Sequence, residues 1–148
     1  MNGPTPIWIE AFEAPIRDNP TAQVAFAAFC FLMLLDILLG YASAVKSKTV
    51  KSAKMREGLW HKTGEMGIVA VGDVLDGMML GGIDMPFSAP VTTAIIVYLA
   101  INEAVSCMEN AVKLDPELGD KRFFRVLMAT LSDASDKPSD GDGAHDAA

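Results

Sequence analysis

Three long apolar stretches of this 148-residue chain each contain acidic residues in their interior. The acids are Asp36 in the first stretch, Asp73 and Asp76 in the second, and Glu103 in the third. An ionised side chain at the centre of a bilayer costs about 2.5 to 3.5 kcal/mol, so none of these residues can face lipid. Helices built from these stretches must therefore turn their acids toward protein or toward a water-filled space.

The lengths of the stretches predict membrane spans. The first, from about 21 to 45, has Asp36 as its only charged residue, and as a helix it would reach about 37 Å, enough to cross a hydrocarbon core of about 30 Å. The second, from about 66 to 83, is short and too acidic to insert alone, so it is predicted as the second leg of a hairpin. The third runs from about 90 to 108. The sequence thus predicts an all-α, three-span transmembrane domain over residues 21–131.

Basic residues set the predicted orientation. Half of the chain's 12 Lys and Arg residues lie in the connection from 46 to 62, whereas the turn from 84 to 90 has none. The six are Lys46, Lys48, Lys51, Lys54, Arg56 and Lys62. Because loops rich in Lys and Arg stay in the cytoplasm, the basic connection predicts an N-out, C-in topology.

The flanks of the spans are predicted to differ from them. Residues 1–20 form an extracytoplasmic segment in which Trp8 and Phe12 are expected along the interface. Residues from about 120 to 131 form a basic amphipathic helix, which either lies on an anionic leaflet or packs against the bundle. Residues 132–148 hold five Asp against one Lys, a composition typical of a disordered, solvating tail.

Small residues accompany the acids on two of the predicted helix faces. An acid and two small residues recur every four positions in the first two spans: Asp36, Gly40 and Ala44, then Asp73, Gly77 and Gly81. Small residues at this spacing allow close helix association in lipid, although ordinary packing within one chain explains them equally well. On the third span, Glu103, Ser106 and Asn110 share a face. The residues predicted to line a polar seam or lumen are Asp36, Asp73, Asp76, Glu103, Ser106 and Asn110.

The pattern does not indicate catalysis. His61 lies in the basic connection and His145 in the acidic tail, so no nucleophile–base arrangement is suggested and an enzyme is not expected. Asp73 and Asp76 alone are a poor signal for a metal, and neither a metal nor a cofactor is predicted. The basic connection lacks interleaved aromatic residues beyond Trp60, which argues against nucleic acid as a partner.

One ordered set of residues carries a family resemblance. The set is Asp36 and Gly40, then Ser52, Gly58, Leu59 and Lys62, then Asp76, and finally Glu103, Ser106, Glu109 and Asn110. It resembles the phage holins of the toxin-secretion and lysis type over about residues 35–131. Asp73 is not assigned to the family's pattern.

The resemblance implies a multi-pass protein of the bacterial cytoplasmic membrane that accumulates harmlessly and then self-assembles into lesions. Its implied partners are other copies of itself, membrane lipids, and an endolysin or toxin as cargo, and the resemblance also allows an antiholin. Two other classes stay open. A narrow ion or proton channel, or a transporter subunit, would also use intramembrane acids, and a soluble helical bundle could bury them in part.

Overall fold

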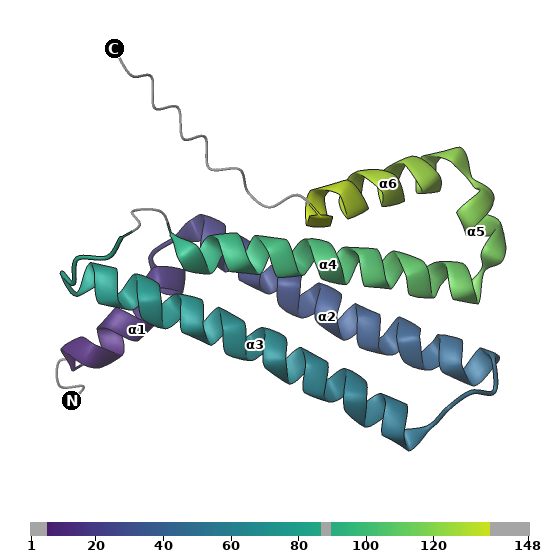
Figure 1. The fold of residues 1–148 in the computed structure, drawn as a ribbon, viewed down its shortest axis with the longest axis horizontal. Helices are drawn as coiled ribbons and strands as arrows, with labels where there is room; N and C mark the ends of the chain where they lie inside the picture. The colour runs from purple at the N-terminus through teal and green to yellow at the C-terminus, as the bar shows by residue number, and fades with distance from the viewer. Residues whose placement is uncertain (1–5, 87–89, 137–148) are drawn as a thin grey trace, which may run out of the picture.

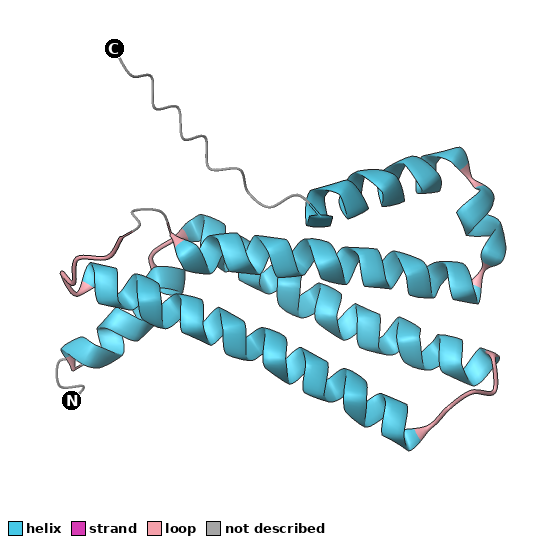
Figure 2. Cartoon of the chain, viewed as in Figure 1, coloured by secondary structure: helices cyan, strands magenta, loops and turns pink. Residues whose placement is uncertain are grey.

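The computed structural model describes residues 6–86 and 90–136, and within these ranges the chain forms helices joined by short connections (Figure 2). The helices are α1 (Ile7–Arg17), α2 (Pro20–Lys46), α3 (Ser52–Leu80), α4 (Val91–Leu114), α5 (Pro116–Asp120) and α6 (Arg122–Asp136). The predicted all-α class is therefore confirmed. The predicted acidic tail lies outside the described residues from 137 onward, as does the side chain of Trp8.

Helix α4 organises the bundle. It packs against α2 over the greatest length and also against α3, while α1 crosses α3 and α6 returns along α4. The connection from α2 to α3 and the short helix α5 lie at one end of the bundle, whereas α1 and residues 81–86 after α3 lie at the other (Figure 1). Helix α6, which contains the predicted amphipathic segment, contacts α4, while Phe123 and Val126 stay exposed on it.

Helix α2 begins where the sequence supplies a cap. The Asn19 side chain accepts hydrogen bonds from the backbone N–H groups of Thr21 and Ala22, at 3.1 and 3.2 Å. Pro20 occupies the first helical position, where its missing N–H costs nothing. The helix then runs without interruption to Lys46, and it covers the whole of the first predicted span.

Helices α3, α4 and α6 each extend beyond the segments expected from the sequence. Helix α3 begins at Ser52, inside the predicted connection 46–62, because the residues there are mostly good helix formers and include no proline. It stops at the turn containing Gly82, whose φ of 86° is in the left-handed region. Helix α4 continues past 108 to Leu114. Helix α6 reaches Asp136 and thus includes the first residues of the expected tail.

The polarity of the bundle is inverted relative to a soluble protein. A small apolar core of Phe29, Val69, Ile96 and Leu99 is buried together with Lys62, Glu65, Asp76, Thr92 and Glu103. Large apolar side chains instead cover the outside of the three long helices. They include Val24, Phe31, Leu34, Ile37, Leu38, Tyr41 and Val45 on α2, Met66, Ile68, Val71, Val74 and Leu80 on α3, and Val97 and Tyr98 on α4. Such an extensive apolar exterior is typical of a surface that contacts lipid.

Two of the described helices, α2 and α4, are long and apolar enough to cross a membrane. Helix α3 falls short of that standard because its first half carries several charged residues and its second half carries Asp73 and Asp76. By length and composition alone, the structure thus contains two candidate spans.

Candidate functional site

The polar interior is built on one stripe of α3. The buried residues of this helix are Lys62, Glu65, Val69, Gly72 and Asp76, with Gly77 beside them. The first five alternate spacings of three and four, so they form a single face along the helix. This face, rather than that of Asp73, Gly77 and Gly81, is the one that α3 turns inward.

Near the start of the stripe, one ammonium group joins three helices. The Lys62 Nζ lies 3.1 Å from Asp36 Oδ2 on α2 and 3.8 Å from Glu65 Oε2 on α3 itself. It also donates a hydrogen bond to Glu103 Oε1 on α4. Glu103 is 1% exposed. We refer to Lys62, Asp36, Glu65 and Glu103 as the Lys62 cluster, and it links helices that otherwise meet mainly through α4.

Additional polar groups extend the Lys62 cluster along α4. Asn110 Nδ2 donates a hydrogen bond to Asp36 Oδ1 at 2.9 Å, and Lys113 Nζ donates to Asn110 Oδ1 at 3.0 Å. Gly40 leaves room for this amide, since a methyl group there would lie 3.4 Å from Asn110 Nδ2. At the edge of the cluster, His61 Nε2 lies 3.2 Å from Glu65 Oε1. The predicted face of Asp36 and Gly40 therefore meets Asn110 within one chain.

The Lys62 cluster contains more acceptors than donors. Three carboxylates converge on a single lysine, and Glu65 Oε2 and Glu103 Oε2 are buried without a hydrogen bond. A buried acceptor left unsatisfied costs about 1–3 kcal/mol, so the arrangement is only partly compensated. The described residues contain no group of three or more His, Cys, Asp or Glu arranged to hold a metal ion.

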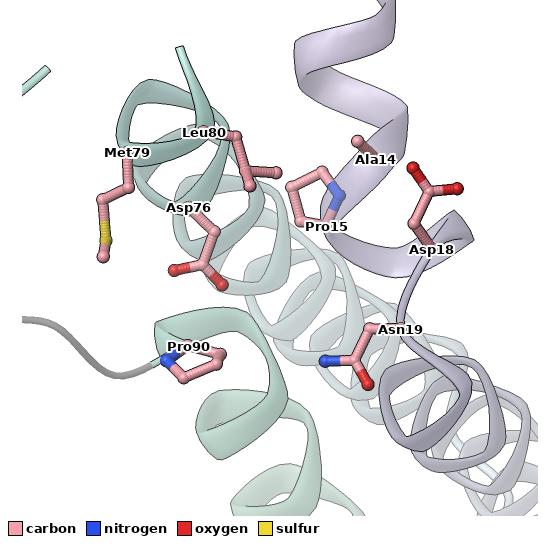
Figure 3. Close-up of a pocket in the computed structure, with 8 residues that line it drawn as sticks. All are labelled: Ala14, Pro15, Asp18, Asn19, Asp76, Met79, Leu80 and Pro90. Atoms are coloured by element: carbon pink, nitrogen blue, oxygen red, sulfur yellow. The ribbon is translucent and has the colours of Figure 1, made fainter. Parts of the chain in front are cut away.

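Asp76, at the other end of the stripe, is satisfied by backbone. Its Oδ1 accepts the N–H of Val91 at 2.8 Å, and its Oδ2 accepts the N–H of Thr92 at 2.9 Å. In Figure 3 the Asp76 carboxylate points toward the first turn of α4, beside Pro90. Pro90 is the N-cap residue but supplies no side-chain hydrogen bond. A side chain of α3 thus caps α4, where the positive end of the helix dipole favours a carboxylate.

Glycines bring the helices close at this end. A methyl group at Gly72 would lie 2.9 Å from Ile95 Cδ1 and 3.2 Å from Thr92 Cα, so α3 and α4 are in near-backbone contact. A methyl group at Gly77 would lie 2.5 Å from the Ala11 carbonyl oxygen of α1. At Gly81, the nearest atoms belong to α3 itself. Gly77 and Gly81, four positions apart on α3, therefore have different surroundings.

A cavity of about 280 Å³ lies between α1, α3 and the start of α4. Its lining, shown in Figure 3, is Ala14, Pro15, Asp18, Asn19, Asp76, Met79, Leu80 and Pro90. Asp18 pairs with the Arg17 guanidinium at 2.8 Å, and the hydrogen bond from Arg17 lowers the pKa of Asp18. Because both Asp76 oxygens accept hydrogen bonds from α4, the acids of this cavity already have partners within the chain.

The remaining predicted residues lie outside the Lys62 cluster. Asp73 is half-buried, with Oδ1 lacking a hydrogen bond, and Ser106 is half-buried on α4. Ala44 is half-buried near the end of α2. Lys46 Nζ donates a hydrogen bond to the carbonyl of Leu114, which ties the ends of α2 and α4 together. The other basic residues, Lys48, Lys51, Lys54 and Arg56, are exposed.

Two members of the Lys62 cluster are not among the seam residues that the sequence predicts. The sequence places Lys62 in the basic connection and predicts no role for Glu65. Their spacing is the signal that could identify them. Lys62 and Glu65 lie on the same helix face as Asp76, because positions 62, 65, 69, 72 and 76 are separated by three or four residues. A helix beginning before Lys62 is required for that pattern to be visible.

Comparison with known protein families identifies a match over most of the chain. The sequence model of the bacteriophage holin family matches residues 21–128, which include nearly all of α2, the whole of α3 and α4, and the first half of α6. Neither a curated protein nor a solved structure matches the chain.

Proposed function

The chain belongs to the bacteriophage holin family, and from that premise we propose that it oligomerises in the bacterial cytoplasmic membrane to open lesions through which an endolysin or toxin passes. Membership implies a membrane-permeabilising role, and holins are non-enzymatic membrane proteins. The self-assembly, the cargo and the residues that line the lesion are the parts that this proposal adds.

The observation that carries the proposal is the inverted polarity of the helices. Glu103 is 1% exposed, whereas Phe31, on the outside of α2, is 65% exposed. In water this arrangement would leave a large apolar surface uncovered. In a bilayer it satisfies both classes of residue, since lipid contacts the apolar exterior and the acids keep their polar partners.

Under this proposal, α3 is the third membrane segment. Its aspartates and its Lys62 are too costly for insertion alone. Beside α2 and α4, Lys62 meets carboxylates from both neighbours, and Asp76 meets the first turn of α4. Lys62 and Asp76 thus find partners on the neighbouring helices, which supports insertion of α3 as part of a bundle.

The Lys62 cluster suggests how a harmless protomer could become part of a lesion. In the packing seen here, the acids are hidden within one chain. If α3 moved away from α2 and α4 during assembly, Asp36, Glu103 and Asn110 would be free to face water in the lumen of an oligomer. The two packings would differ in the partners of one polar seam, as in other conformational switches.

The ends of the bundle support the N-out, C-in orientation. The basic connection between α2 and α3 lies at the same end as α5, and α1 lies at the opposite end with residues 81–86 after α3 (Figure 1). A protein placed with its basic end in the cytoplasm would satisfy the positive-inside rule on both of its cytoplasmic connections.

The test is inducible expression in a bacterium, with membrane potential and release of a cytosolic enzyme recorded together. We expect sudden depolarisation and enzyme release after a delay. The variant Asp36→Asn with Glu103→Gln should change the time of onset, because it removes two charges from the seam. Glu109→Gln, on an exposed position of α4, is the matched control and should leave the onset unchanged. Onset unaffected by the double variant would contradict the role of the seam.

A narrow ion or proton channel is the second candidate. It is favoured by one observation, the convergence of three carboxylates at one level of the bundle, because rings of acids are used to select cations. The same recording separates the two functions. Slow depolarisation without release of the enzyme would support the channel over the lesion.

A further inference from the structure

The first turns of α3 project from the bundle. Every residue from 51 to 61 is exposed, and burial begins at Lys62. In Figure 1 this end of α3 diverges from α2 and α4. We refer to residues 51–61 as the projecting segment. Apart from His61, which pairs with Glu65, its side chains are therefore open to contacts outside this chain.

The projecting segment combines cations with large apolar side chains. Lys51, Lys54 and Arg56 are exposed together with Leu59 and Trp60, which are 63% and 74% exposed. Arg56 and Trp60 are four residues apart and share a helix face. Bulk water suits the cations but not the indole, whereas the headgroup region of an anionic leaflet suits both.

The position of the projecting segment relative to the membrane follows from the rest of α3, which continues from it. Lys62 is held in the seam. From Met66, about 6 Å further along the helix axis, the exposed side chains of α3 are uncharged as far as Leu80. The hydrogen bond from Lys46 to Leu114 marks the ends of α2 and α4 at this same end of the bundle. With α3 in the membrane, the projecting segment lies at the level of the lipid headgroups.

We propose that the projecting segment is a binding site for anionic phospholipid headgroups of the cytoplasmic leaflet. Lys51, Lys54 and Arg56 contact the phosphates, and Trp60 inserts its ring at the boundary between headgroups and acyl chains. Glu57 is the only acid between 46 and 61, so the cations are largely uncompensated within the segment. This inference rests on the membrane placement of α3 in the proposed function.

Fluorescence of Trp60 provides the test. The chain has two tryptophans, so the full-length Trp8→Phe variant reports on Trp60 alone. It is reconstituted in mixed vesicles of phosphatidylglycerol and phosphatidylcholine, with bromine on the acyl chains of one lipid or of the other at equal mole fraction. We expect brominated phosphatidylglycerol to quench Trp60 about twofold more strongly, because each nearby cation enriches the anionic lipid.

Charge variants identify the residues responsible. Replacing Lys51, Lys54 and Arg56 together with Gln should equalise the two quenching efficiencies. The matched control replaces Lys121, Arg122 and Arg125 at the start of α6 with Gln and should retain the preference. Raising the salt concentration should weaken the preference of the parent protein, which provides a second readout without a mutation.

The quenching results distinguish failure of the lipid site from failure of the proposed function. Equal quenching by the two lipids in the parent protein, or a preference that survives the first triple variant, would overturn the lipid site while leaving α3 at the membrane. Absence of quenching by either lipid would overturn both, since α3 would then not lie in the bilayer.

Discussion

At one end of the seam, Asp76 accepts hydrogen bonds from two backbone N–H groups of α4, whereas further along three carboxylates share the ammonium group of Lys62. The Asp76 carboxylate is balanced, because each of its oxygens has its own donor. The Lys62 cluster is not, because Glu65 and Glu103 each keep a buried oxygen without a hydrogen bond. One helix thus uses two different means of burying acids.

The two ends also differ in how easily their partners can be withdrawn. The N–H groups of Val91 and Thr92 are fixed in the first turn of α4, and they leave Asp76 only if the helix unwinds or α3 moves as a whole. Lys62 is a long side chain with several rotatable bonds. We infer that α3 pivots near Asp76 and separates from α2 and α4 at the Lys62 cluster when the bundle opens.

The largest effect is expected from Lys62→Met, which removes the only cation of the Lys62 cluster. The three carboxylates would then be buried without a counter-charge, and breaking such a pair costs about 3–5 kcal/mol. The measurement is the free energy of unfolding in detergent micelles, followed by circular dichroism. Lys54→Met, at an exposed position of the same helix, is the control and should have little effect. Equal stability of the two variants would show that the cluster does not hold the helices together.

A smaller loss is expected from Gly77→Ala. The added methyl group would meet the backbone oxygen of Ala11 at 2.5 Å and push α1 from α3, and such overpacking costs about 1–3 kcal/mol. Gly81→Ala is the matched control, because its methyl group would meet only atoms of α3. If both alanine variants unfold at the same denaturant concentration, α1 does not depend on Gly77 for its position.

Loss of the cap is the next test. Asp76→Ala removes both acceptors from the first turn of α4, and loss of an N-cap side chain costs about 0.5–2 kcal/mol. Asp76→Asn retains one oxygen acceptor and should lose less. Unfolding of the two variants measured side by side provides the comparison. An asparagine variant as unstable as the alanine variant would argue that the charge, and not the hydrogen bonds, fixes this end.

The smallest effect is predicted for Glu65→Gln, which should change the free energy of unfolding by less than about 1 kcal/mol. It removes one of three negative charges while Lys62 keeps Asp36 and Glu103 as partners. The same unfolding measurement applies, with Glu57→Gln at an exposed position of α3 as control. A loss as large as that of Lys62→Met would mean that Glu65, and not the other two acids, is the main partner.

Much of this arrangement could be predicted from the sequence, because the cost of acids in lipid restricts where they can face. That argument predicts polar partners for Asp36, Asp76 and Glu103. In the structure, Lys62 lies beside Asp36 and Glu103, and Asp76 accepts backbone N–H groups. The four-residue spacing of Asp36 and Gly40 also indicated the face of α2 that meets Asn110. These inferences depend only on local pattern and on the solvent.

The rest required tertiary information. The pairing of Lys62 depends on where α3 begins and on which helices α3 meets. Lys62 is one of six basic residues in the connection from 46 to 62, and the basic pattern alone does not distinguish it from the other five. The capping of α4 by Asp76 joins residues 15 and 16 positions apart, across a turn whose geometry no local pattern fixes. The close contact at Gly77 likewise depends on where α1 crosses α3.

A double-mutant cycle between Lys62 and Glu103 tests the central claim most directly, namely that Lys62 holds acids of the neighbouring helices within the same chain. Unfolding free energies are measured for the parent, for Lys62→Met, for Glu103→Gln and for the combined variant. We predict a coupling of about 0.5–3 kcal/mol, so that the Glu103 change costs less once Lys62 is absent. Purely additive losses would contradict the account.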